Sequence, residues 1–483
     1  MLSRRNFLKI GSLSLMNLLW SSYNDVSGFD VKSEYKSKDL ISNLKNIGPL
    51  KKPDSNGIML PEGFSLKIVA ESGKRPLPQK NFTWHSAPDG GATFKTTNNG
   101  WVYVSNSERY FGGVSALEFN SEGILIDAYS ICKGTHMNCA GGTVEGMKWL
   151  TCEETSTGQV YECDPSGKND SKVLPALGRF KHEAVAEDYL NKYLYLTEDT
   201  PDGGFYRFIP DGLTKDGKIN FSSGKLQIAV LNDDSQEGKV EWKNIKDSNP
   251  PIWQILLKIN ELRYQVKDSA KFNGGEGIAY YEGKIYFATK GDNKIWCYDT
   301  KNQNIIALYD HSTHPNPILS GVDNIVFSSS GDLFVAEDGG DMQIVAIDSD
   351  GSLVPILQIM GQDESEITGP AFDPSNERLY FSSQRGKSGS ASDGVTYEVK
   401  GPFIKNLIQF KLFPYPRASL ISSIIFLCSP FLLLIKGVSI INDSFSSYFS
   451  YRSSTISEAD FPSRLSPCIG HFGTPALAKS NLK

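Results

Sequence analysis

The sequence GRFKHEAVAEDYLNKYLYLTEDTPDGGFYRFIP, residues 178–210, contains a complete β-hairpin pattern. An alternating run at residues 184–186 and an apolar strand at residues 193–196 are joined by a polar turn. The start of the first strand and the end of the second lie side by side in an antiparallel hairpin. Glu183 and Glu198 are therefore expected to meet at one edge, where gathered carboxylates repel one another unless a cation lies among them.

This hairpin belongs to a repeat. Its strand pattern recurs with aromatic residues at Tyr103, Trp149, Tyr195, Tyr286, Phe334 and Tyr380. The intervals are 46, 46, 91, 48 and 46 residues, and a small-residue or acidic motif precedes each strand end. This period predicts an all-β fold, a six-bladed β-propeller at residues 60–403, with a metal cluster at one mouth of the central channel. The long interval holds either a divergent repeat or an insertion, with a strand-like stretch at residues 226–230 and a helix-like stretch at residues 253–266.

The N-terminus predicts export. Arg4 and Arg5 are followed by Asn6, then by Phe-Leu-Lys and an apolar run at residues 10–20. This pattern in residues 1–30 is typical of a twin-arginine signal, so we expect the twin-arginine export machinery as a partner and a periplasmic or secreted protein. Residues 31–59 are polar and are expected to form a linker.

The repeat pattern is lost at residues 404–483. This tail contains a mostly apolar run at residues 419–435, near the lower length limit for a membrane helix. Three alternatives remain open: a translated frameshift or other non-native extension, a C-terminal membrane anchor, and a buried part of the fold. The abrupt loss of the repeat favours the first.

Composition narrows the function. The 483 residues are 39% hydrophobic, with a net charge of -6 and no long basic run. Because nucleic-acid binding depends on positive charge, we expect no nucleic-acid partner. We also expect a monomer. Seven cysteines without CxxC spacing argue against a disulfide framework and a structural zinc site, leaving at most one pair involving Cys152 or Cys163. The sequence has no GxSxG, P-loop or HExxH motif, which argues against the common serine-hydrolase, nucleotide-binding and zinc-protease classes.

Acidic residues and one thiol are predicted at the shared mouth. They are Cys139, Glu153, Glu154, Glu183, Glu198, Asp199, Glu276, Asp323, Glu337 and Asp338. Oxygen-rich sites suit hard cations such as Ca²⁺, and a thiolate among carboxylates indicates a transition metal. Any single glutamate here could instead be a solvated residue at a strand end. Cys139 could instead be a small buried hydrophobic residue. Recurrence at equivalent repeat positions favours a metal cluster.

Basic residues near these positions are candidates for anion binding. Arg385, just after the last repeat strand, and Arg179 are the candidate catalytic residues, with a surface charge as the alternative for Arg179. Lys181 and Lys290 are further candidates. His182 precedes Glu183 in a strand, where neighbours face opposite sides, so we expect a structural role for it.

Two motifs carry a family resemblance. Asn138-Cys139-Ala140-Gly141-Gly142 and Leu150-Thr151-Cys152-Glu153-Glu154 resemble the PhoX-type alkaline phosphatases, and the resemblance covers roughly residues 60–403. It implies a six-bladed propeller, exported by the twin-arginine route, that hydrolyses phosphate esters outside the cytoplasm with Fe³⁺ and Ca²⁺ at the channel mouth. It also implies that Cys139 ligates iron and that Glu276 is a ligand, and it places Glu153, Glu183 and Glu198 in family motifs.

The chain departs from this family at Gly274, where the phosphatases carry an arginine two residues before the matched glutamate. It is also a short member without large insertions between blades. Either Arg385 or Arg179 supplies the phosphate contact, or the substrate differs. We therefore predict a metal-dependent phosphoric monoester hydrolase acting on a small phosphorylated substrate. The alternatives are a calcium-dependent lactonase-type propeller with one ion and a non-catalytic, metal-stabilised propeller used for binding.

Overall fold

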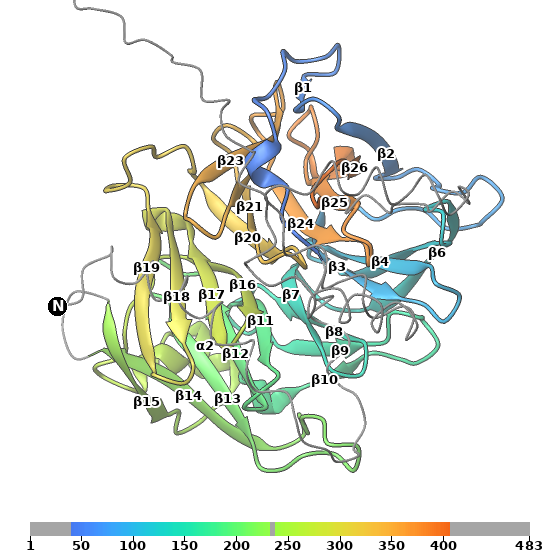
Figure 1. Ribbon diagram of the computed structural model, residues 1–483. Helices are drawn as coiled ribbons and strands as arrows, with labels where there is room; N and C mark the ends of the chain where they lie inside the picture. Colours follow the sequence, from blue (N-terminus) through green and yellow to red (C-terminus); the bar gives the residue numbers. More distant parts are fainter. Residues whose placement is uncertain (1–39, 232–236, 406–483) are drawn as a thin grey trace, which may run out of the picture. The chain divides into compact units, whose positions relative to one another are not determined.

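The computed structural model describes residues 40–231 and 237–405, which form an all-β, propeller-like arrangement (Figure 1). The predicted signal at residues 1–30 and the apolar run at residues 419–435 lie outside the described residues. The described part contains four sheets of four or five strands and one sheet of nine strands. No helix among the described residues has the length and apolar character needed to cross a membrane.

The strands follow one another around the fold in sequence order. The first two sheets contain β3 (Pro88–Lys95), β4 (Trp101–Ser107), β5 (Gly113–Phe119) and β6 (Leu125–Lys133), then β7 (Asn138–Val144), β8 (Lys148–Glu153), β9 (Val160–Cys163) and β10 (Lys172–Val173). The nine-stranded sheet contains β11 (His182–Asp188), β12 (Tyr193–Glu198), β13 (Phe205–Pro210), β14 (Gly224–Leu231), β15 (Gly238–Asn244), β16 (Gly275–Tyr281), β17 (Lys284–Thr289), β18 (Lys294–Asp299) and β19 (Asn304–Asp310). The last two sheets contain β20 (Val322–Phe327), β21 (Leu333–Glu337), β22 (Gln343–Ile347), β23 (Leu353–Ile359) and β1 (Ile58–Met59), then β24 (Ile367–Phe372), β25 (Arg378–Ser383), β26 (Val395–Lys400) and β2 (Ser65–Glu71).

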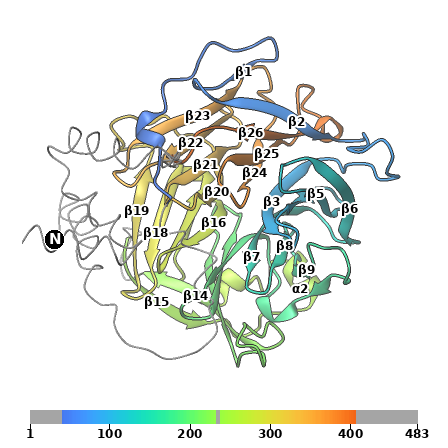
Figure 2. The same ribbon diagram turned by 45° about the vertical axis from the view of Figure 1, so that its right-hand side comes forward.

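Every hairpin predicted from the repeat is present as an antiparallel pair. The pairs are β3–β4, β7–β8, β11–β12, β16–β17, β20–β21 and β24–β25. Their first strands contact one another in the order β3, β7, β11, β16, β20, β24 and back to β3. Figure 2 shows most of these first strands gathered at the centre of the fold. We call the end where the first strands begin the mouth.

The long interval in the repeat contains an insertion. Because β11 contacts β16 directly, no further first strand lies between them. The predicted strand at residues 226–230 is β14, and β15 joins β14 to β19 through two residue pairs, which produces the nine-stranded sheet. The helix-like stretch forms only the five-residue α2 (Ile252–Leu256) and a short 3-10 turn, because Lys258 adopts a left-handed φ of 55° that ends the helix.

The two ends of the described chain close the arrangement. β2 pairs with β26, so an N-terminal strand completes the last sheet and joins it to the start of the ring (Figure 2). Residues 40–59, expected to be linker, also contact the fold, because β1 pairs with β23 and Leu44 is buried. The last sheet therefore combines strands from both ends of the described chain, β2 from the start and β24, β25 and β26 from the end.

The aromatic residues of the repeat form the packing between sheets. Tyr103, Tyr195 and Phe334 are fully buried, as are Trp149 and Tyr380, while Tyr286 is partly buried against its neighbours. Tyr103 and Tyr380, from adjacent sheets, stack with ring centroids 5.2 Å apart. The period seen in the sequence therefore records one large side chain per hairpin filling the space between sheets.

All five cysteines of the described residues are free thiols, so Cys152 and Cys163 form no disulfide there. Cys152 and Cys163 are instead buried in the apolar core, where thiols behave as small hydrophobes.

The glycines of the Cys139-Ala140-Gly141-Gly142 motif allow neighbouring first strands to approach closely. A Cβ atom on Gly142 would lie 1.8 Å from the backbone oxygen of Val185 in β11. We expect Gly142→Ala to lower the free energy of unfolding by about 3 kcal/mol, measured by urea denaturation. Gly212→Ala is the control, because a Cβ atom there meets nothing within 4 Å. Equal stability of the two variants would contradict this packing.

Candidate metal centre

The second residue of most first strands points into the mouth. These residues are Asp89, Cys139, Glu183, Glu276 and Asp323. The strand register shifts at this place in every first strand, for example between His182 and Val185 in β11. A β-bulge inserts an extra residue and re-aims a side chain. The bulges thus bring one ligand-type side chain from each of these strands to the same place.

A second set of side chains comes from the residue directly after each second strand. They are Glu108, Glu154, Asp199, Lys290, Asp338 and Gln384. Successive residues along a strand face opposite sides. These side chains therefore face the mouth, whereas the last residue of each second strand faces the interior of its own sheet. The mouth therefore receives two side chains from each hairpin.

Four overlapping groups of potential ligands result among the described residues. They are Cys139 with Glu154 and Glu183; Asp89 with Glu108 and Glu366; Glu183 with Glu276 and Asp323; and Asp323 with Asp338 and Glu366. Within each group the ligand atoms lie within 4.8 Å of one another. Glu183, Asp323 and Glu366 each belong to two groups, so the groups form one connected set, which we call the ligand cluster.

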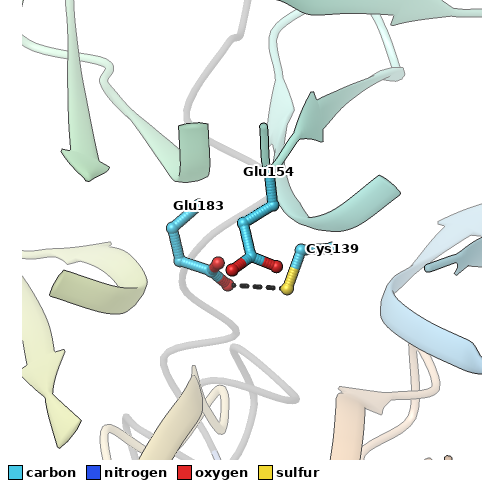
Figure 3. Close-up of side chains that lie close together, drawn as sticks. All are labelled: Cys139, Glu154 and Glu183. Atoms are coloured by element: carbon cyan, nitrogen blue, oxygen red, sulfur yellow. Dashed lines mark hydrogen bonds between the residues drawn. The ribbon is translucent and has the colours of Figure 1, made fainter. Parts of the chain in front are cut away.

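The first of these groups combines a thiol with two carboxylates (Figure 3). The Cys139 Sγ donates to Oε1 of Glu183 at 3.2 Å. The other oxygen of Glu183 is buried and has no hydrogen-bond partner among the described residues. A buried acceptor without a donor is costly, and a cation placed between the thiolate and the carboxylates would remove that cost. The residues at this position therefore fit a metal ion.

Burial and crowding oppose ionisation of the cluster. Burial, followed by the neighbouring carboxylates, raises the pKa of Asp89, Glu183 and Glu366 well above the usual range. Burial also raises the pKa of the Cys139 thiol, to which Asp89 and Glu183 add. Without a cation the protonated forms of these groups are favoured, and metal uptake would release protons.

In the part of the chain that the structure describes, three cationic side chains border the cluster. Lys181 bridges Glu154 at 2.8 Å and Asp199 at 2.7 Å. Lys290 contacts Glu276 at 2.9 Å, Asp338 at 3.0 Å and Asp323 at 3.9 Å. Arg385 contacts Glu366 at 2.7 Å and Asp338 at 3.7 Å. Each of these positive charges is therefore paired with at least two carboxylates of the mouth.

Arg179 is placed differently from Arg385. Its guanidinium donates to the backbone oxygen of Thr157 at 3.4 Å and to Oε1 of Gln159 at 3.2 Å. Arg179 thus stabilises a turn through these two hydrogen bonds. Of the two candidate arginines, Arg385 alone contacts the cluster.

Glu153, Glu198 and Glu337 were expected at the mouth, but the structure places them outside the ligand cluster. As the last residues of β8, β12 and β21, they face the interior of their sheets. Each accepts a hydrogen bond from the backbone six residues later, from Gln159, Gly204 and Gln343 respectively. Glu198 also accepts from Arg263 at 2.9 Å. Their oxygens satisfy backbone donors of the turns that follow.

His182 lies against the core. Its Nε2 donates to the backbone oxygen of Gly178 at 3.2 Å, and its ring packs on Phe180 with centroids 3.6 Å apart. Burial lowers the pKa of His182 to about 3, so the ring is neutral. This placement agrees with the structural role expected from strand alternation.

Sequence reasoning did not single out Asp89, Glu108 and Glu366 as ligands. Asp89 and Glu108 were detectable, because they occupy the repeat positions of Glu183 and Glu154. Glu366 precedes β24 and has no counterpart in the other hairpins; an isolated bridge with Asp338 holds it in place.

Fold and centre together define a propeller-like all-β protein with a thiol- and carboxylate-lined cluster at one mouth. Residues 155–318 match the family model described as Alkaline phosphatase PhoX. The resemblance to the PhoX-type alkaline phosphatases is thus confirmed.

A solved structure of a PhoX protein shows a similar fold. PhoX of Pseudomonas fluorescens, in complex with the transition-state analogue vanadate, matches with a TM-score of 0.60 and 16% identity over 75% of this chain and 98% of its own. A gluconolactonase, XC5397 from Xanthomonas campestris, matches with a TM-score of 0.41 and 13% identity over 74% of this chain and 98% of its own. A protein of unknown function from Bacteroides thetaiotaomicron matches with a TM-score of 0.44 and 10% identity over 73% of this chain and 83% of its own. No curated protein matches the chain.

Proposed function

We propose that this chain is a metal-dependent phosphoric monoester hydrolase that acts on small phosphorylated substrates outside the cytoplasm. The observation that carries the proposal is the ligand cluster, in which Cys139 and the carboxylates meet and which Lys290 and Arg385 border. The mixed donor set suits Fe³⁺ at the thiol-containing group and Ca²⁺ at the all-oxygen groups. Counting the nine-stranded sheet as two blades joined through β15 and β19 makes the propeller six-bladed.

In this proposal the protein side chains position and neutralise the phosphate. Bound ions would supply electrostatic stabilisation of charge on the phosphoryl oxygens. Arg385 presents a guanidinium that matches a phosphate group in two-point geometry, and Lys290 adds a point charge. The backbone N–H of Lys290 donates to the oxygen of Gly274 at 2.9 Å. Lys290 therefore lies beside the position where the family carries its arginine, and it replaces that positive charge.

The remaining parts of the proposal concern the cell. Export by the twin-arginine machinery would deliver a folded, metal-loaded monomer to the periplasm or beyond, and the tail at residues 404–483 would decide whether it attaches to a membrane. Finding the protein in the cytoplasm of its native host, with the signal intact, would contradict this part.

The proposal predicts that Cys139→Ala loses both metal and activity. Exported wild-type protein should contain iron and calcium by elemental analysis and should hydrolyse an aryl phosphate. Removing the thiol should eliminate the iron and lower kcat by on the order of 100-fold or more, because the electrostatic stabilisation of the transition state is lost. Cys297→Ala is the control, since Cys297 is a buried thiol in β18 outside the cluster.

Three outcomes would count against the proposal. Unchanged activity of Cys139→Ala would remove the thiol from the mechanism. Calcium alone with lactone hydrolysis would favour a lactonase-type enzyme. Calcium alone with no turnover of any ester would favour a binding protein.

A further inference from the structure

Two of the most exposed apolar side chains lie in the loop that follows the mouth end of β4. Tyr110 and Phe111 are 69% and 83% exposed, and their rings meet edge to face with centroids 4.9 Å apart. The ring of His136 lies 5.3 Å from that of Tyr110 and 6.4 Å from that of Phe111. We call Tyr110, Phe111 and His136 the aromatic rim. Three rings gathered in solvent contribute little to the core, so another role is needed to account for them.

The backbone of the aromatic rim is firmly held. Gly112 N donates to Thr135 O at 2.8 Å, and Met137 N donates to Arg109 O at 2.7 Å. The His136 ring bonds the backbone oxygen of Tyr110 at 2.5 Å through Nδ1. The loop after β4 and the loop before β7 are thereby joined. A surface that is already ordered loses little conformational entropy when a ligand settles on it.

The same two loops carry parts of the ligand cluster. Glu108 lies two residues before Tyr110, and the backbone N–H of Glu154 donates to the oxygen of Met137 at 2.8 Å. Cys139 follows Met137 at the start of β7. The aromatic rim therefore lies in the two loops that adjoin these ligands, at the mouth end of β4 and β7.

We propose that the aromatic rim binds the leaving group of the substrate, and that the preferred substrates are phosphate monoesters of aromatic alcohols. This inference rests on the proposed function. A phosphate anion held among cations needs no apolar contact, so the rings serve the part of the ester that departs. In the reaction a water oxygen forms a bond to phosphorus, the phosphorus–oxygen bond to the leaving group breaks, and the proton from water passes to the aryl oxygen.

Aromatic surfaces favour flat, apolar partners. An aryl group can stack on or pack edge to face against Tyr110 and Phe111, whereas a polar aliphatic alcohol such as glycerol gains little there. The rim is small and adjoins an acidic cluster, which suits one ring of a small substrate better than a membrane surface or a protein partner.

Comparing two esters tests the inference. With full-length, metal-loaded protein, Phe111→Ala should lower kcat/KM for phenyl phosphate about 10-fold, mainly through KM, and should leave kcat/KM for glycerol 2-phosphate unchanged. Tyr110→Ala should act in the same direction. Leu190→Ala is the control, because Leu190 is 75% exposed in the β11–β12 turn at the end opposite the mouth. It should change neither value.

Each result has a separate meaning. Equal losses for both esters would show a structural role for Phe111 and overturn the inference while leaving the proposed function intact. Unchanged kcat/KM for phenyl phosphate in both rim variants would overturn it in the same way. Failure of the wild type to hydrolyse either ester would overturn the proposed function, and this inference with it.

Discussion

Replacing Glu183 with glutamine is expected to abolish metal binding and turnover while leaving the metal-free fold intact. Glu183 belongs to two of the four ligand groups, so its loss affects more than one ion position. Burial and the nearby carboxylates raise the pKa of Glu183, which favours the uncharged form of the metal-free group, and glutamine resembles that form in charge and shape. The amide oxygen can still accept from Cys139. We expect kcat to fall by on the order of 100-fold or more.

Thermal unfolding separates loss of metal from loss of fold. In chelator, Glu183→Gln should unfold at the wild-type temperature. At a metal concentration of about 100 times Kd, the wild type should gain about 2.7 kcal/mol and the variant almost nothing. A variant that keeps the metal-dependent gain would show that Glu183 holds no ion.

Glu187→Gln is the matched control, since Glu187 is a buried glutamate at the other end of β11 and outside the ligand cluster. Burial raises the pKa of Glu187 to about 7, so the folded wild type holds this proton more tightly than the unfolded chain. The associated stability is present below the unfolded pKa and is lost as pH rises through 7. The neutral amide should abolish this loss without changing metal content or activity.

Sequence periodicity predicted the hairpins well for a physical reason. Each hairpin places one large aromatic residue, such as Tyr195 or Tyr380, between sheets, and a packing requirement repeated around a ring leaves a period that can be counted. The pairing of β15 with β19 left no such signal, because it joins only two residue pairs at the sheet edges. Edge pairing depends on backbone position more than on side chains.

The centre was predicted in part, and strand alternation explains the division. Glu153 and Glu154 are adjacent carboxylates, yet only Glu154 enters the ligand cluster. Glu153 accepts backbone hydrogen bonds from His136 and Gln159, which joins the segments before β7 and after β8. Alternation alone could have separated such pairs, but which member faces the mouth depends on the β-bulges, and a bulge leaves no reliable trace in a single sequence.

Replacing Lys290 with methionine is expected to make the fold depend on metal. Lys290 contacts three carboxylates of the cluster, and Glu276 and Asp323 are almost fully buried. Removing the cation leaves these charges facing one another in a medium that solvates them poorly. In chelator at pH 8 we expect the free energy of unfolding to fall by about 3 kcal/mol, at the low end for a buried pair because the Lys290 side chain is 34% exposed.

The loss in Lys290→Met should depend on pH and on added metal. Burial raises the pKa of Asp323 to about 7 even with Lys290 present, and the variant pKa should be higher. Protonation relieves the repulsion, so the destabilisation should be small at pH 5 and should grow as pH rises through 7. Calcium should restore most of the stability, because a divalent ion can take the place of the ammonium group. Lys218→Met is the control, since Lys218 pairs with an exposed aspartate, and its effect should stay within about 0.5 kcal/mol. If Lys290→Met matched this control at pH 8 in chelator, Lys290 would not be the charge that offsets the cluster.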